Sequence, residues 1–338
     1  MQILDNRLFD KIYIIGFGSI GNRYFRIVND NNLSRETLIF DRFNNKSSGN
    51  GFNYFNKLDE IRAKKDDLII IANPASCHYE TLIQMLNCAA PILLEKPLSK
   101  EVLTTPKVKK LNNMFEFIHV GYNLRYHPAA KLIQGHVVKQ TYGEVISIFG
   151  EVSSFLPQWR PGKDYSKTVS AQAELGGGVL LELSHEIDLI NYIYKKIPSV
   201  SGQFDRVSGL KINVEDTAVL NFKFENQGKR VLGNLNMCFA SHRPSRKLLL
   251  NCTHASLELD LNANKLSIFK DNSVDVITFE KYENRDQTYI DQIKDIHLRF
   301  SKNRKPTCGI LDANHVLGVI CAAKISKSNM SRYARVPK

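Results

Sequence analysis

The sequence predicts two domains: an α/β domain built on a parallel sheet, followed by a domain dominated by antiparallel strands. Three observations carry this prediction. The chain has 338 residues, a length that favours two domains over one. Up to about residue 125, short apolar runs alternate with segments of helical spacing, as in βαβ units. Beyond that point, β-rich runs follow one another across short polar turns, which is typical of antiparallel sheets.

In the first part of the chain, β-rich or apolar runs predict strands over 11–15, 38–40, 67–72, 91–94 and 117–120. Helical spacing predicts helices over 19–29 and 78–87, and a third over 99–112 that Pro106 would interrupt. The polar, glycine-containing segment 44–53 is the expected flexible loop. Strands that alternate with helices in this way predict a parallel sheet.

In the second part, similar runs predict strands over 145–152, 200–207, 217–224, 230–239, 247–252, 256–261 and 265–269. Helices are expected over 185–194, 287–301 and 312–326. We place the domain boundary where the pattern changes, so that the predicted domains are 1–122 and 123–338.

Composition and charge narrow the range of partners. The formal net charge is +12, but the lysines and arginines are spread along the chain, so we expect no nucleic-acid partner. An anionic substrate or a generally basic proteome are the alternatives. No segment approaches about 18 uninterrupted apolar residues, so we expect no membrane span. The N-terminus lacks a basic region followed by an apolar core, so we expect no signal peptide.

The six cysteines lie far apart, and none of them forms a Cys-x-x-Cys pair. Such spacing indicates neither a zinc site nor a disulfide framework. We therefore expect reduced thiols in a cytoplasmic protein, and no metal ion.

A glycine-rich turn, Gly16-Phe17-Gly18-Ser19-Ile20-Gly21, follows the first predicted strand. It lies between a strand and a helix, which is the context that a dinucleotide-binding fingerprint requires. Gly16 permits the tight turn, Gly18 lets the backbone approach a pyrophosphate, and Gly21 allows the helix to pack closely on the strand. The helix N-terminus then faces the phosphate charge. A glycine turn that holds no ligand is the alternative.

Asp41 ends the second predicted strand, 20 positions after Gly21. A carboxylate there accepts hydrogen bonds from the adenosine ribose hydroxyls and repels a 2′-phosphate, which favours NAD over NADP. Arg42 weakens this preference, because an adjacent arginine can pair with the phosphate. NAD is therefore the expected cofactor, with NADP as the alternative.

Two further loops are expected at the same edge, because open α/β sheets bind ligands outside the carboxyl ends of their strands. Asn73-Pro74 ends the third strand, and Asn73 is a candidate contact of the ribose or nicotinamide. For His78, just beyond, packing within the next helix is favoured over catalysis. Glu95-Lys96-Pro97 follows the fourth strand, where Pro97 keeps Lys96 extended and ends the strand. Lys96 is thereby aimed at the expected nicotinamide.

A second polar cluster runs over residues 174–188 and contains three consecutive glycines. Ser184 is placed to cap the helix that begins near His185. In the first turn, the helix dipole favours a neutral imidazole, which can accept a proton. Asp188 shares that face of the helix, where it orients His185 or anchors the helix. A purely structural histidine is an alternative of about equal weight.

Five segments occur in an order that resembles the Gfo/Idh/MocA oxidoreductases, namely 16–21, 73–74, 95–97, 121–128 and 176–188. The resemblance covers nearly the whole chain. It implies an N-terminal Rossmann domain and a C-terminal α+β domain with an open, mostly antiparallel sheet. It also implies a tightly held nicotinamide cofactor, a substrate that is a sugar, cyclitol or sugar nucleotide, and a homodimer or homotetramer.

The resemblance puts the family's catalytic lysine at Lys96 and its histidine at His185. In the oxidation direction, His185 would take the hydroxyl proton while Lys96 hydrogen-bonds the same oxygen. Family members often carry an aspartate four residues before the histidine, but here that position is Leu181. Glu182 stands one place later and is the candidate for a third catalytic carboxylate.

The sequence of segment 174–188 is similar to that of a subgroup associated with bacterial surface-glycan pathways, and residues 242–246 fit that subgroup too.

The candidate cofactor contacts are Gly16, Phe17, Gly18, Ser19, Ile20, Gly21, Asp41, Arg42, Asn73, Pro74, His78, Glu95, Lys96 and Asn123. The candidate substrate contacts are Arg125, Tyr126, Trp159, Tyr165, His185 and Arg246. A regulatory or scaffold subunit that binds NAD or a sugar without catalysis is the alternative class of function, and the departure at Leu181 is its main support.

Overall fold

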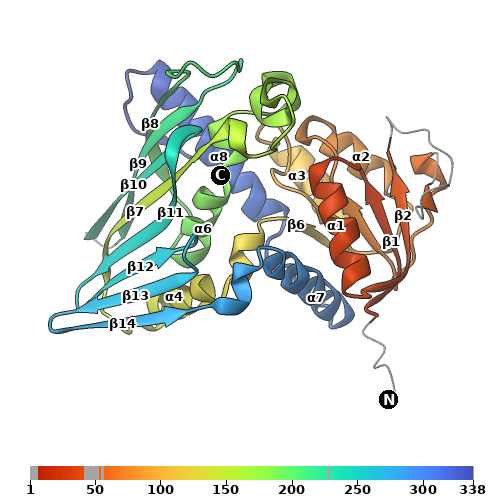
Figure 1. Ribbon diagram of the computed structural model, residues 1–338, viewed down its shortest axis with the longest axis horizontal. Coiled ribbons are helices and arrows are strands. Elements are labelled where there is room, and N and C mark those ends of the chain that lie inside the picture. The colour runs from red at the N-terminus through yellow and green to blue at the C-terminus, as the bar shows by residue number, and fades with distance from the viewer. Residues whose placement is uncertain (1–6, 42–52, 55–56, 227–228, 338) are drawn as a thin grey trace. The chain divides into compact units, whose positions relative to one another are not determined.

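The computed structural model describes residues 7–41, 53–54, 57–226 and 229–337, which form two units (Figure 1). Unit 1 contains Met1–Asn123 together with Asp286–Asn314, and unit 2 contains Leu124–Arg285 together with His315–Lys338. The expected loop 44–53 lies almost wholly outside the described residues. Within them, no helix has both the length and the apolar character needed to cross a membrane.

Unit 1 is built on a parallel sheet with the strand order β3-β2-β1-β4-β5-β6. Its strands are β1 (Phe9–Ile15), β2 (Ser34–Phe40), β3 (Asn53–Tyr54), β4 (Leu68–Ile71), β5 (Ile92–Leu94) and β6 (Ile118–Val120). Every residue of β4, β5 and β6 is buried, as expected of strands covered on both faces. The predicted α/β class is confirmed, and only the two-residue β3 was not foreseen.

Three helices of unit 1 follow strands along the chain: α1 (Ser19–Asp30), α2 (His78–Gln84) and α3 (Thr105–Met114). Pro106 lies in the first turn of α3, so the prediction that it interrupts a helix over 99–112 is wrong. A proline is well tolerated there, because N–H groups of the first turn have no partner within the helix and its fixed φ suits helical backbone.

A fourth helix, α7 (Gln287–Ser301), also belongs to unit 1, although the sequence assigned it to the second domain. Ile290, Ile293 and Ile296 recur at helical spacing and are buried in one apolar cluster with side chains of β1 and α1. The Asp286 carboxylate also pairs with Arg26 of α1 at 2.5 Å. Because α7 packs into this core, the first unit is discontinuous in sequence and extends beyond the predicted range 1–122.

Unit 2 contains a second sheet, in the order β14-β13-β12-β11-β7-β10-β9-β8-β15. Its neighbours pair antiparallel, except β7 and β10, which run parallel. The strands are β7 (Val145–Phe155), β8 (Ser199–Asp205), β9 (Thr217–Asn226), β10 (Lys229–Cys238), β11 (Ala240–Cys252), β12 (Ser256–Asp260), β13 (Lys265–Lys270), β14 (Ser273–Thr278) and β15 (Ala334–Arg335). The predicted mostly antiparallel sheet is confirmed. The sequence missed β14, which is exposed along nearly its whole length and so lacks a buried face.

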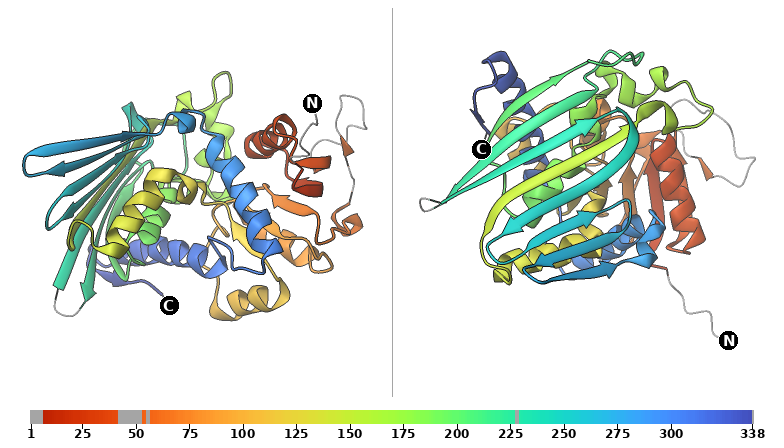
Figure 2. Two further views of the ribbon diagram at one scale, coloured as in Figure 1. Left: turned by 90° about the horizontal axis from the view of Figure 1, so that it is seen from below. Right: turned by 60° about the vertical axis from the view of Figure 1, so that its left-hand side comes forward.

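The helices of unit 2 are α4 (Pro128–Lys139), α5 (Val179–Glu182), α6 (His185–Ile193) and most of α8 (Ile310–Ser328). They lie on one face of the sheet of unit 2, and the right-hand view of Figure 2 brings forward the opposite face, over which no described helix lies. The sequence did not predict α4, because Gly135 and two neighbouring valines weaken its helical pattern. The ring of His127 caps α4 by accepting a hydrogen bond from Ala129 N at 3.3 Å.

Candidate active site

The loops after β1, β4, β5 and β6 of unit 1 all begin at one edge of its sheet. Gly16 N donates to Phe40 O at 2.8 Å, and Glu95 N donates to Ile71 O at 2.8 Å, which aligns the ends of these strands. The chain order reverses between β1 and β4, and open α/β sheets bind ligands outside such a point. Within unit 1, the glycine turn, Asn73 and the Glu95–Pro97 loop therefore share the expected edge.

The three glycines of the fingerprint have different structural roles. Gly16 has φ +95°, and a Cβ on it would lie 2.6 Å from Asn73 N, so the turn after β1 touches the loop after β4. A Cβ on Gly21 would lie 2.0 Å from Gly16 O, so only glycine lets α1 approach β1. A Cβ on Gly18 meets no atom within 4 Å. Gly16 and Gly21 serve packing, whereas Gly18 leaves open space at the start of α1.

The N-terminus of α1 fits an anion. Gly18 is the N-cap, no described side chain caps the helix, and its first turn contains no acidic residue. The Asn22 side chain donates to Phe17 O at 2.8 Å and to Gly18 O at 3.0 Å, which holds the turn closed. Ser19 is exposed at the first helical position. The available backbone N–H groups and the positive end of the helix dipole suit a pyrophosphate.

Asp41 lies directly after β2, next to Phe40, whose carbonyl accepts the hydrogen bond from Gly16 N. The residue is half-buried and follows the strand that neighbours β1. This is the position at which dinucleotide-binding domains carry the acid that contacts ribose. Arg42 lies outside the described residues, so its predicted role stays a prediction.

His78 is fully buried, and both of its ring nitrogens face backbone carbonyl oxygens. Nδ1 lies 2.8 Å from Pro97 O, and Nε2 lies 2.9 Å from Asn73 O. One ring thus joins the loop after β4 to the loop after β5. His78 is therefore not an exposed cofactor contact but a packed residue that spaces the two loops, as the favoured alternative had it. The Asn73 amide donates to Thr81 Oγ1 at 2.8 Å.

Burial lowers the pKa of His78, and hydrogen bonds to the carbonyls of Asn73 and Pro97 oppose that shift. The folded-state value lies below the ordinary 6.5, so between the two values the unfolded chain binds more protons. The stability that neutral His78 contributes is therefore present above the ordinary value and is lost as the pH falls toward the folded-state value.

We expect a His78→Gln variant to lose less unfolding free energy than the unchanged chain when the pH is lowered from roughly 7 to 5. The difference should not exceed about 1.4 kcal/mol per pH unit, which is the limit for one proton. Denaturant unfolding of both proteins at the two pH values measures it. Equal losses of unfolding free energy in the two proteins would contradict a lowered pKa of His78.

Glu95 and Lys96 have different environments although they are neighbours. Glu95 is 6% exposed, and its Oε1 lies 2.5 Å from the Tyr24 hydroxyl of α1. Its Oε2 accepts the backbone N–H of Lys96 at 3.2 Å. Glu95 is therefore a buried support of the loop, which differs from its predicted role as a cofactor contact. Lys96 is half-buried at the carboxyl edge of the sheet.

Asn123, a predicted cofactor contact, is also buried. Its amide donates to Thr288 Oγ1 of α7 at 2.8 Å, and its exposed fraction is 6%. The amide thus ties the end of unit 1's first segment to α7, which sequence spacing could not reveal. We assign Asn123 to support of the fold.

In unit 2, the glycine run before His185 is a packing device. A Cβ on Gly177 would lie 2.3 Å from Val169 O, and one on Gly178 would lie 2.4 Å from Glu215 Oε1. The predicted cap is wrong: the Ser184 hydroxyl donates to Leu181 O at 2.8 Å and makes no cap to α6. His185 is half-buried and is the first residue of α6, as predicted.

The carboxylates near His185 are engaged by other side chains. Glu182 Oε2 accepts the Ser170 hydroxyl at 2.6 Å. Asp188 is fully buried and receives Arg125 Nε at 2.9 Å and Nη2 at 2.6 Å. Arg125 is 5% exposed and Tyr126 is 2% exposed, so both side chains are packed in the core, and their contact with substrate stays a prediction. A bidentate partner lets the Arg125 charge be buried.

Trp159 and Tyr165 lie in the long loop after β7 and are half-buried. Trp159 Nε1 donates to Ser154 Oγ at 2.8 Å, and its ring packs edge-on against Phe239 at 5.2 Å. The Tyr165 hydroxyl accepts Lys211 N at 3.0 Å. These contacts favour the packing alternative for Trp159, and substrate contact remains a prediction for both residues.

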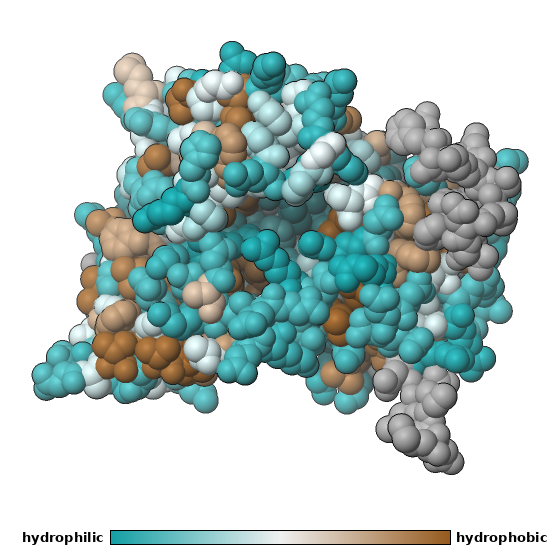
Figure 3. All heavy atoms as spheres, in the orientation of Figure 1, coloured by the Kyte–Doolittle hydropathy of each residue, from teal (hydrophilic) through white to brown (hydrophobic). Residues whose placement is uncertain are grey.

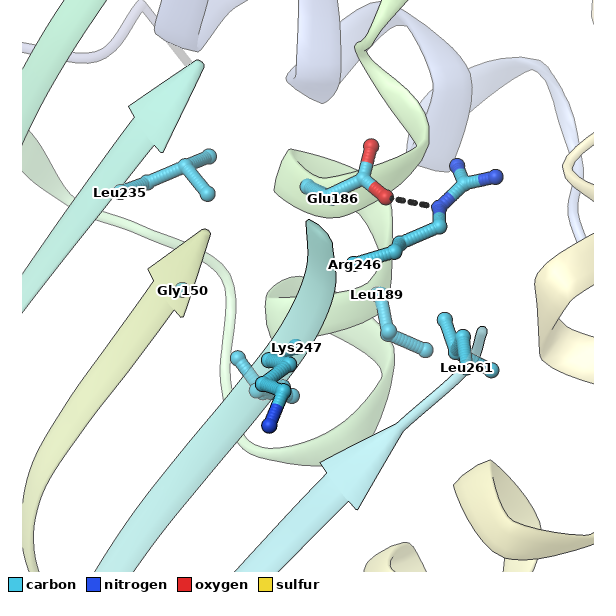
Figure 4. A pocket seen from close by; sticks show the side chains of 8 residues that line it. Gly150, Glu186, Leu189, Leu235, Arg246, Lys247 and Leu261 are labelled. Atoms are coloured by element: carbon cyan, nitrogen blue, oxygen red, sulfur yellow. Dashed lines mark hydrogen bonds and ion pairs between the residues drawn. The ribbon is translucent and has the colours of Figure 1, made fainter. Parts of the chain in front are cut away.

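Arg246 of β11 is joined to the first turn of α6. Its Nε donates to Glu186 Oε1 at 2.5 Å beside a small pocket to whose lining four leucines contribute (Figure 4). The figure shows the two terminal nitrogens of Arg246 pointing away from Glu186. Glu186, next to His185, is 5% exposed and was missed by sequence reasoning, which treated it only as a flanking acid.

Strand order, the open glycine turn and the α1 terminus define unit 1 as a dinucleotide-binding domain of the Rossmann type, followed by an α+β domain. The chain belongs to the Gfo/Idh/MocA family: residues 11–117 match its oxidoreductase, NAD-binding Rossmann-fold domain, and residues 131–258 match its C-terminal domain. The resemblance seen in the sequence is thereby confirmed.

Curated relatives match in part. The chain is 24% identical over 200 residues to the rhizopine catabolism protein MocA of Rhizobium meliloti, covering 56% of this chain and 58% of that protein. It is also 24% identical over 200 residues to glucose-6-phosphate 3-dehydrogenase of Bacillus subtilis strain 168, covering 55% and 54%. The chain thus spans little more than half the length of these relatives.

Two solved structures share the fold across the chain. Levoglucosan dehydrogenase in complex with NADH gives a TM-score of 0.82 at 17% identity, over 97% of this chain and 99% of that chain. Myo-inositol 2-dehydrogenase from Lactobacillus plantarum gives a TM-score of 0.76 at 19% identity, over 97% and 100%. At these identities the likeness shows the fold.

Proposed function

We propose that this chain is an NAD-dependent oxidoreductase that transfers a hydride between nicotinamide and a carbinol or carbonyl carbon of a sugar, cyclitol or sugar nucleotide. The observation that carries the proposal is the open turn at Gly18. No described side chain caps α1 there, and a Cβ on Gly18 would meet no atom within 4 Å, so the backbone N–H groups face open space. Lys96 lies at the same edge of the same sheet. The expected compartment is the cytoplasm.

NAD is favoured over NADP by Asp41. A carboxylate directly after β2 accepts hydrogen bonds from ribose hydroxyls and repels a 2′-phosphate. The main chain at Gly16–Gly21 would hold the pyrophosphate, while Glu95, His78 and Asn123 support the loops from within.

Lys96 and His185 share the proton chemistry. In the oxidation direction, bound nicotinamide supplies the hydride acceptor. Lys96 hydrogen-bonds the substrate oxygen and stabilises the charge that grows on it. His185, at the start of α6, takes the hydroxyl proton. Glu182, which follows Leu181 and takes the place of the family's aspartate, is the third group of the site after Lys96 and His185. It steadies the segment before His185 by accepting the Ser170 hydroxyl.

The substrate class is supported by relatives named glucose-6-phosphate 3-dehydrogenase and inositol 2-dehydrogenase. Within that class, the resemblance of segment 174–188 to a surface-glycan subgroup favours sugar nucleotides as the first compounds to test. Trp159, Tyr165 and Arg246 are the remaining candidate contacts outside the reacting groups.

The test is a panel of sugars, cyclitols and sugar nucleotides with NAD, followed at the nicotinamide absorbance band. Reduction of NAD by a panel member, lost in His185→Asn, supports the proposal. NADH binding without turnover of any member, in either direction, would favour a regulatory or scaffold subunit instead.

A second copy of this chain is the partner that fits the open face of the sheet in unit 2. Large apolar side chains are exposed along its strands: Ile146, Phe149, Val219, Leu232, Phe269, Val274 and Val276. Phe269 and Val274 lie directly opposite each other on β13 and β14, so they share one face. Apolar side chains gather at the lower left of Figure 3, where β13 and β14 lie in Figure 1. Apolar side chains that gather on one exposed face favour an interface.

We expect Leu232→Arg to weaken a homodimer or homotetramer, because Leu232 is 57% exposed in the middle of the open sheet face and a buried guanidinium there would lack a partner. Light scattering after size exclusion measures the mass. Val138→Arg is the matched control, since Val138 is 74% exposed on α4. An assembly that survives Leu232→Arg, or dissociates equally with Val138→Arg, would contradict this interface.

A further inference from the structure

A chain of buried polar side chains lies beneath Lys96 within unit 1. Tyr24, His119 and Gln292 are each fully buried, and Glu95 is 6% exposed. They come from α1, β6, α7 and the end of β5. The Tyr24 hydroxyl lies 2.5 Å from Glu95 Oε1 and 3.2 Å from Gln292 Oε1, and Gln292 Nε2 lies 3.1 Å from His119 Nε2.

Hydrogen counting restricts the protonation of these groups. The Tyr24 hydroxyl has one hydrogen but faces two oxygens, Glu95 Oε1 and Gln292 Oε1. An ionised carboxylate and an amide carbonyl are both acceptors only, so an ionised Glu95 would leave one of them without a hydrogen. If Glu95 carries a proton, it donates to Tyr24, Tyr24 donates to Gln292, and the Gln292 amide donates to His119. Each of these contacts is then satisfied in one direction.

We propose that Glu95 is held at neutral pH as a carboxylic acid that donates its proton to Tyr24, and that this neutral acid positions the backbone of Lys96. Its Oε2 accepts the Lys96 N–H at 3.2 Å, so the acid acts on the lysine's main chain. This role for Glu95 rests on the proposed function of Lys96.

The surroundings of Glu95 act in both directions. Burial raises its pKa, while the Tyr24 hydroxyl and the charges of Lys96 and Arg23 oppose that shift. Burial raises the pKa of Tyr24 well above its ordinary range, so Tyr24 keeps its own hydrogen. His119 joins this set of buried polar side chains through its contact with Gln292, and the ring of Tyr289 of α7 packs edge-on against Tyr24.

The Glu95 carboxyl packs closely against the backbone at the end of β6. A Cβ on Gly121, at the end of β6, would lie 3.0 Å from Glu95 Oε1 and 3.3 Å from its Cα. Glycine at that position makes room for the carboxyl between β5, β6 and α1. The acid is therefore fixed by packing as well as by Tyr24.

Infrared spectroscopy of the full chain with ¹³C-labelled glutamate tests the protonation directly, without substrate. We expect a protonated-carboxyl C=O band at neutral pH that shifts with the label and is missing from Glu95→Gln. In Tyr24→Phe, which removes the acceptor of that proton, the band should move. Only carboxylate bands in the difference spectrum would overturn the proposal, and they would mean that the Gln292 amide is reversed and Glu95 ionised. A band that Tyr24→Phe leaves unmoved would also overturn it.

The pH dependence of unfolding tests the protonation of Glu95 independently. An acid with a raised pKa holds more protons in the folded chain, so its contribution to stability falls as the pH rises from its ordinary value of 4.5. The unfolding free energy of Glu95→Gln, relative to the unchanged chain, should therefore increase with pH. A constant or decreasing difference would overturn the proposal. Neither measurement requires turnover, whereas the substrate panel tests the oxidoreductase function, so the two failures are distinguishable.

Discussion

Lys96→Met is expected to lower turnover of the panel substrate by about 10²- to 10⁴-fold, the range that a positioned proton-handling group contributes. The variant should still bind NADH, because the glycine turn and the α1 terminus are untouched. A methionine fills similar space but cannot hydrogen-bond the substrate oxygen or balance its charge. Steady-state kinetics with NAD and a nicotinamide fluorescence titration separate the two effects.

Lys100→Met is the matched control for this variant. Lys100 is half-buried in the same stretch after β5, four residues beyond Lys96. Its replacement removes the same charge but should change turnover little. Near-normal turnover of Lys96→Met, or an equal loss in Lys100→Met, would remove Lys96 from the chemistry.

Gly21→Ala should destabilise unit 1 severely, because the new Cβ would lie 2.0 Å from the backbone oxygen of Gly16. Backbone atoms cannot move aside as a flexible side chain does, so α1 would have to shift away from β1. We expect a loss of about 3 kcal/mol or more in unfolding free energy, at the upper end for overpacking. Denaturant unfolding measures the loss.

Gly18→Ala separates binding from stability at the same turn. Gly18 has φ −69°, which alanine adopts readily, and its Cβ would meet no atom within 4 Å. Stability should stay within about 0.5 kcal/mol of the unchanged chain. NADH affinity should fall about tenfold or more, because the methyl group occupies the approach to the pyrophosphate. Unchanged affinity in Gly18→Ala, or unchanged stability in Gly21→Ala, would contradict the different roles of the two glycines.

Local patterns were sufficient to predict the elements that position the cofactor edge. The isoleucine-rich run of β4 is buried on both faces, and such runs are readable without any partner. The glycine spacing likewise predicted the turn after β1, since helix and strand follow it directly. The effect of Pro106 was predicted wrongly because proline breaks a helix in its interior but is well tolerated in its first turn. Only its position relative to the helix start decides between the two.

The parts that the sequence could not predict depend on contacts between distant residues. Asn123 meets Thr288, and Tyr24 meets Gln292, across more than 160 positions of the chain. No spacing pattern connects such pairs, so the sequence revealed neither that α7 belongs to unit 1 nor that Glu95 contacts Tyr24. Arg125 shows the same limit, because an arginine suits a substrate site and a buried pair with Asp188 equally well.

Hydride transfer itself is the most direct test of the proposed function. A panel member that reduces NAD would be synthesised with deuterium on the carbon that carries the reacting hydroxyl. Magnetic resonance of the product would then be used to look for deuterium at C4 of the nicotinamide. We predict one deuterium at C4 for the unchanged chain and none for Lys96→Met over the same time. NADH that binds tightly while no panel member exchanges label with it in either direction would contradict an oxidoreductase.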